Sequence, residues 1–73
     1  MCLGVPMKLI EVTYPVGIAE AKGVRRKVYL QLIPEDQLRP GDYVIVHVGF
    51  AIQKLSREEA EETWRLLEEA LGA

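Results

Sequence analysis

Residues 41–52 read Gly-Asp-Tyr-Val-Ile-Val-His-Val-Gly-Phe-Ala-Ile and form the most apolar stretch of the chain. A run that is apolar on both faces is typical of a strand buried within a sheet or barrel. Gly49 interrupts the run and predicts a bulge or a tight bend where one strand becomes two. Continuous alternation would place on one face Val44, Val46, Val48, Phe50 and Ile52, and on the other Tyr43, Ile45, His47, Gly49 and Ala51.

The chain before this stretch holds further strand candidates. Residues 24–33 alternate with a period of two, which predicts a half-buried strand. Its apolar face would hold Val24, Arg26, Val28, Leu30 and Leu32. Residues 8–12 and 16–21 are shorter candidates, and turn signals rich in proline and glycine separate these runs.

After residue 55 the pattern changes to that of a helix. Ser56 and Glu59 form a capping box, with serine at the N-cap and glutamate three residues later. Trp64 lies on the apolar stripe and is expected in the core, and Glu61 and Arg65 are spaced as a favourable i,i+4 pair. The whole stripe comprises Ala60, Trp64, Leu67 and Leu71.

Together these patterns predict a mainly β protein, a small OB-like β-barrel with one C-terminal α-helix. Closing the sheet would remove the exposed edges of a flat sheet this small. The 73 residues allow a single domain, 1–73, in which residues 1–55 form the barrel with a mobile N-terminal Cys2 and residues 56–72 form the helix. A monomer is the expectation for the free chain.

Composition narrows the classes of function. The formal net charge of −2 does not indicate the positively charged surface that binding to nucleic acid requires. One cysteine and one histidine can form neither an internal disulfide nor a closed four-ligand zinc site. No signal peptide and no membrane-spanning run is visible, so a cytoplasmic location without membrane contact is expected. No set of nucleophile, base and orienting residue is visible, which argues against catalysis.

Two residues are candidates for chemistry. Cys2 would become the first residue if Met1 is removed, and its thiolate and amine could then bind a soft metal or attack an electrophile. The alternative is a cysteine packed against the barrel. His47 is either a metal ligand or proton carrier, or a hydrogen-bonded structural residue. A basic cluster at residues 25–27 is either solvated surface or a docking site for an acidic partner.

Three segments resemble one known family. Met-Cys-Leu-Gly-Val-Pro at residues 1–6 resembles the N-terminal signature of the HypC/HupF hydrogenase maturation chaperones. Residues 41–52 resemble the second signature of that family, and residues 23–28 also fit. The resemblance covers nearly the whole chain, and two ordered motifs make it specific. Many members carry glycine after the proline where this chain has Met7, which puts in doubt any turn with positive φ at that position.

The resemblance implies a non-catalytic chaperone of nickel–iron hydrogenase assembly. Its expected partners are the iron–sulfur scaffold protein HypD and the precursor of the hydrogenase large subunit. Its expected cargo is iron carrying two cyanides and one carbon monoxide, Fe(CN)2CO, held transiently rather than as a permanent cofactor. Cys2 carries over as the essential thiolate and His47 as the accompanying candidate ligand. The partner-binding segment comprises Cys2, Leu3, Gly4, Val5 and Pro6.

Two other classes of function remain open from the residues alone. An OB-like barrel could bind single-stranded nucleic acid through aromatic side chains and a basic groove, but the charge is negative and aromatic residues are few. A small redox or N-terminal-nucleophile enzyme could use Cys2. Binding to single-stranded DNA or RNA that depends on salt would support the first, and an activated thiol the second.

Overall fold

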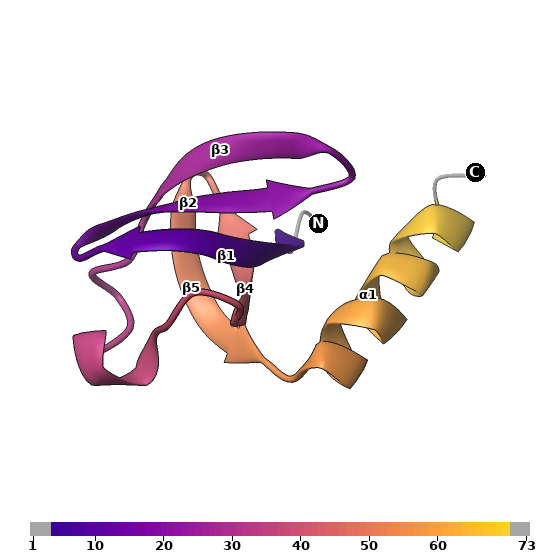
Figure 1. Cartoon of the computed structure of the whole chain (residues 1–73). Helices are drawn as coiled ribbons and strands as arrows, with labels where there is room; N and C mark the ends of the chain where they lie inside the picture. The colour runs from indigo at the N-terminus through magenta and orange to yellow at the C-terminus, as the bar shows by residue number, and fades with distance from the viewer. Residues whose placement is uncertain (1–3, 71–73) are drawn as a thin grey trace.

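The computed structural model describes residues 4–70, and Figure 1 shows strands on one side and a helix beside them. In chain order the elements are β1 (Val5–Thr13), β2 (Val16–Ala21), β3 (Val24–Tyr29), the short 3-10 helix η1 (Glu35–Gln37), β4 (Tyr43–His47), β5 (Phe50–Leu55) and α1 (Arg57–Ala70). The mainly β class with one C-terminal helix, predicted from the sequence, is confirmed.

The five strands close into a barrel in the order β1-β2-β3-β5-β4. β1 closes it by pairing with β2 on one side and β4 on the other, both antiparallel. β3 and β5 run parallel and meet at one pair only, Tyr29 with Phe50. The remainder of β3 therefore pairs with β2 alone, so the β2–β3 hairpin extends beyond the closed part of the barrel.

The core lies inside this barrel. Leu9, Val28, Leu30 and Val44 are fully buried, and they come from β1, β3, the segment after β3 and β4. Each strand therefore contributes buried side chains to one cluster. No buried side-chain polar atom among residues 4–70 lacks a hydrogen-bond partner.

Several strand boundaries differ from the expectation, and two of the differences matter for the fold. β1 begins at Val5 rather than residue 8, because Val5 to Lys8 pair with β4 and thereby close the barrel. β3 ends at Tyr29 rather than residue 33. There the chain turns inward, with the Leu30 N–H donating to the Pro15 carbonyl at 2.7 Å and the Ile33 N–H donating to the Leu30 carbonyl at 3.0 Å. As a result Leu32 is 60% exposed. Val24, at the hairpin end of β3, is also 51% exposed, so the predicted continuous apolar face is interrupted at both ends.

The bend predicted at Gly49 is confirmed, but the prediction of which side chains after it share a face was wrong. Val48 and Gly49 form a two-residue turn with φ of 53° and 81°, and β4 and β5 flank it as a hairpin. Residues opposite each other across a hairpin share a face. Val46 therefore lies opposite Ala51 inside the barrel, whereas Phe50 and Ile52 face outward. Val48 stands at the tip and is 81% exposed.

The helix begins with the predicted capping box. The Glu59 N–H donates to Ser56 Oγ at 3.0 Å, and the Ser56 N–H donates to Glu59 Oε1 at 2.9 Å. Glu61 pairs with Arg57 at 3.1 Å instead of with Arg65, and this hydrogen bond raises the pKa of Arg57. No helix within residues 4–70 is long and apolar enough to cross a bilayer.

Trp64 is not in the barrel core as predicted but half-buried between α1 and β1. Its indole Nε1–H donates to the Pro6 carbonyl at 2.8 Å. Lys22 Nζ lies 5.0 Å from the centre of the Trp64 ring and 2.6 Å from Glu68 Oε2. These contacts attach the middle of the helix to β1 and to the β2–β3 turn. The barrel core itself is made of smaller apolar side chains.

Candidate functional site

Gly4 is the first described residue, and it holds the chain tightly against β4. Its φ is +88°, a conformation that residues other than glycine rarely adopt. A Cβ at this position would lie 2.7 Å from the Val46 carbonyl oxygen and 2.8 Å from Ile45 Cγ2. Conformation and close approach therefore both require glycine here, immediately after the segment that carries Cys2.

The next three residues form the start of β1. Pro6 is fully buried, and its carbonyl accepts the Trp64 hydrogen bond. Val5 is 36% exposed, so it is the accessible side chain among the described members of the predicted partner-binding segment. Met7 is a buried strand residue, and the positive φ falls on Gly4 instead of on position 7. The methionine is therefore compatible with this backbone.

His47 is the last residue of β4 and lies on its outward face. β4 alternates between buried and half-buried side chains, and His47 shares the half-buried set with Tyr43 and Ile45. Its partner across the hairpin is Phe50, whose ring lies 5.5 Å from that of Tyr29. The imidazole therefore stands at the edge of an aromatic cluster, outside the barrel core.

The register between β1 and β4 relates this histidine to the N-terminal segment. Val5 pairs with Val46 and Pro6 with Ile45 in an antiparallel ladder. Extending this register by one residue puts Gly4 opposite His47. Cys2 and Leu3 lie outside the described residues, as does the predicted mobility of Cys2. No three His, Cys, Asp or Glu side chains within residues 4–70 converge on a common metal position.

An apolar groove of about 600 Å³ lies between α1 and the outer face of β4 and β5. Gly4 is at its edge, Ile45 and Ile52 line it from the barrel, and Leu66 and Leu67 line it from the helix. Leu66 and Ile52 are 56% and 44% exposed. This groove was not predicted, because Ile52 was expected on the same face as Val44 and Val46 and Leu66 was left off the apolar stripe. The helical i, i+3, i+7 spacing of Thr63, Leu66 and Ala70 was the available signal.

The site thus combines a glycine-anchored N-terminal segment, one histidine on an outward strand face and an apolar groove. An exposed apolar groove of this kind marks a candidate binding surface. The chain belongs to the HupF/HypC family, whose family model matches residues 1–67. That match includes the N-terminal segment, all five strands and most of the helix.

Curated relatives agree with this assignment. The chain is 46% identical over 70 residues to hydrogenase maturation factor HypC of Cupriavidus necator, covering 94% of this chain and 76% of the relative. It is 40% identical over 75 residues to HypC of Rhizobium leguminosarum bv. viciae, covering 99% and 96%. It is 37% identical over 70 residues to hydrogenase maturation factor HybG of Escherichia coli K12, covering 86% and 83%. The relatives are maturation factors, so the family is one of accessory proteins and not of enzymes.

Proposed function

We propose that this protein is a chaperone of hydrogenase maturation, with the Cys2 thiolate as its essential group. The single observation that carries the proposal is the family match over residues 1–67, which includes the segments around both Cys2 and His47. Relatives named as hydrogenase maturation factors, 37–46% identical to this chain, support the process in which it acts.

The geometry around Gly4 supports a joint role for Cys2 and His47. Cys2 precedes Gly4 by two residues in the sequence, and the extended β1–β4 register puts Gly4 opposite His47. Thiolate and imidazole together are a soft, incomplete ligand set. A metal carrier needs such an incomplete set, because the protein that receives the metal next must be able to compete for it. We assign His47 as the second ligand on this basis.

The cargo in this proposal is the iron group Fe(CN)2CO. It is received in a complex with a HypD-type iron–sulfur scaffold protein and handed to the precursor of the nickel–iron hydrogenase large subunit. A low-spin iron with cyanide and carbonyl ligands is soft and exchanges slowly, and a thiolate suits it. Val5 and the apolar groove beneath α1 supply exposed contact surface beside the N-terminal segment.

Complementation of a strain that lacks the gene tests the proposal. Cys2→Ser should abolish processing of the large subunit and hydrogenase activity, while the purified variant keeps the circular dichroism spectrum of the wild type. His47→Gln should lower the iron content of the scaffold complex more than it lowers scaffold binding. Tyr43→Phe is the matched control, because Tyr43 lies on the same outward face of β4. Normal processing with Cys2→Ser would refute the thiolate role, and equal loss of iron and binding with His47→Gln would make His47 structural.

A further inference from the structure

The free edge of β3 is a feature that the proposed function does not use. β3 pairs with β2 along its whole length but with β5 at Tyr29 only. The Tyr29 N–H donates to the Gly49 carbonyl at 2.8 Å, on the β5 side, and the Leu30 N–H donates to the Pro15 carbonyl on the β2 side. Backbone groups alternate between the two edges of a strand. The N–H and C=O groups of Arg25 and Lys27 therefore point to the edge that has no neighbouring strand among residues 4–70.

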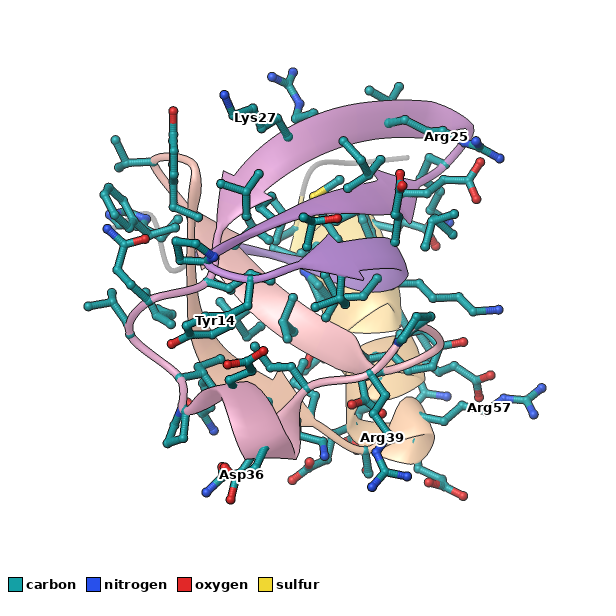
Figure 2. All side chains as sticks on the ribbon, turned by 60° about the vertical axis from the view of Figure 1, so that its left-hand side comes forward. Tyr14, Arg25, Lys27, Asp36, Arg39 and Arg57 are labelled. Carbon is teal, nitrogen blue, oxygen red and sulfur yellow. The ribbon has the colours of Figure 1, made fainter. Side chains whose placement is uncertain are left out.

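Side chains along this edge carry positive charge. Arg25 and Lys27 point away from the barrel on the outer face of β3 (Figure 2). Arg25 lies 3.5 Å from Glu20, and Lys27 Nζ lies 5.5 Å from the centre of the Tyr29 ring. Only Val28 is buried among the six residues of the strand. The acidic residues of the chain are concentrated in α1, which holds six glutamates against two arginines.

The inner side of the same edge opens on an apolar pocket of about 330 Å³. Arg26 lies opposite Ala19 and two residues before Val28, so its Cβ points to the core-facing side. It lines this pocket together with Val5, Val46 and Val48. Val48 keeps a positive φ that a β-branched residue rarely adopts, and it is 81% exposed. Strain kept at an exposed apolar position is a sign of a contact that needs that side chain.

We infer that the free edge of β3 binds an extended, acidic segment of a partner protein by strand addition. Main-chain hydrogen bonds to Arg25 and Lys27 would hold the segment in register beside β3, as in other cases of an added strand. Glutamate or aspartate side chains on its outer face would meet Arg25 and Lys27, because opposite charges directly across strands stabilise pairing. Aliphatic side chains on its inner face would enter the pocket beside Val48. This contact goes beyond the proposed function and shares only Val5 with the described part of the N-terminal segment.

Backbone hydrogen exchange measured by NMR tests the inference with a defined probe. The probe is the capped peptide acetyl-Val-Glu-Val-Glu-Val-amide, and the neutral control replaces both glutamates with glutamine. With the probe at ten times its dissociation constant, exchange of the Arg25 and Lys27 amides should slow roughly tenfold, because only about a tenth of the protein is then free. The amides of Arg26 and Val28 point to β2 and should not change.

Charge-reversal variants separate the local contact from net charge. Arg25→Glu with Lys27→Glu should weaken probe binding at least about tenfold, from two opposed pairs at up to about 1 kcal/mol each and the repulsion that replaces them. Arg39→Glu with Arg57→Glu makes the same change in net charge at the opposite end of the molecule (Figure 2) and should leave binding within about twofold.

The inference would be overturned by unchanged exchange at Arg25 and Lys27, by equal protection by the neutral peptide, or by equal weakening by both charge-reversal variants. Protection of these amides in the free protein that falls on dilution would also overturn it, since a second copy of this chain would then occupy the edge.

Discussion

Substitution of Gly4 by alanine tests how the N-terminal segment is held. Alanine would have to adopt a φ near +88°, which costs about 1–2 kcal/mol for a residue with a Cβ. That Cβ would also lie 2.7 Å from the Val46 carbonyl oxygen, and forced overpacking of this kind costs about 1–3 kcal/mol. We expect Gly4→Ala to lower the free energy of unfolding by about 2–5 kcal/mol. This loss is a large fraction of the total stability of a small domain.

Gly23→Ala is the matched control for this substitution. Gly23 has a φ of +81°, but a Cβ there would meet no atom within 4 Å. Its expected loss is therefore only the conformational part, about 1–2 kcal/mol. Equilibrium unfolding in urea, followed by circular dichroism and by Trp64 fluorescence, measures both variants under the same conditions. The difference between them isolates the close approach of Gly4 to β4.

A difference below about 0.5 kcal/mol between the two variants would refute this reasoning, because the normal error of additive estimates is of that size. The chain before Val5 could then leave the barrel without contact to Val46, and the register argument for Cys2 and His47 would lose its support. A selective loss in Gly4→Ala, accompanied by a loss of scaffold binding, would instead connect the anchoring of this segment to function.

Three further substitutions test other parts of the structure. Ser56→Ala removes one half of the capping box with Glu59 and should destabilise the protein by about 1 kcal/mol in urea unfolding; no change would mean that the cap is not formed in solution. Trp64→Phe leaves the Pro6 carbonyl without its donor and should lower the free energy of unfolding, followed by circular dichroism, by about 1–2 kcal/mol. No change would mean that this hydrogen bond does not hold α1 against β1 in solution. Val48→Asn should stabilise the protein by about 1 kcal/mol in thermal unfolding, because asparagine accepts positive φ more readily in this turn, and destabilisation would contradict the turn geometry.

Much of the fold could be predicted from local patterns. The β2 boundaries, the bend at Gly49 and the capping box at Ser56 each depend on neighbouring residues only, and all three were correct. The faces of β5 were wrong because a two-residue hairpin reverses the alternation after it, and the sequence marks the turn without marking its length. The end of β3 was also missed, since the turn at Leu30 is stabilised by Pro15, a residue distant in sequence.

The site was less predictable than the fold, because it depends on long-range register. Cys2 and His47 could be chosen by residue type and by resemblance, but only the β1–β4 ladder relates the start of the chain to the end of β4. The hydrogen bond from Trp64 to Pro6 joins residues 58 positions apart, and no local pattern predicts it. The basic cluster at residues 25–27 was seen, but the free edge beside it appears only in the sheet topology.

Infrared spectroscopy of the complex with the scaffold protein tests the central proposal most directly. The complex is purified from cells that produce the wild type or Cys2→Ala, and iron is measured in the same samples. The wild-type complex should show both cyanide and carbonyl stretching bands together with bound iron, and Cys2→Ala should lose the bands and the iron while its barrel stays folded. Bands of undiminished intensity in the Cys2→Ala complex would contradict the assignment of Cys2 as the thiolate that holds the iron group.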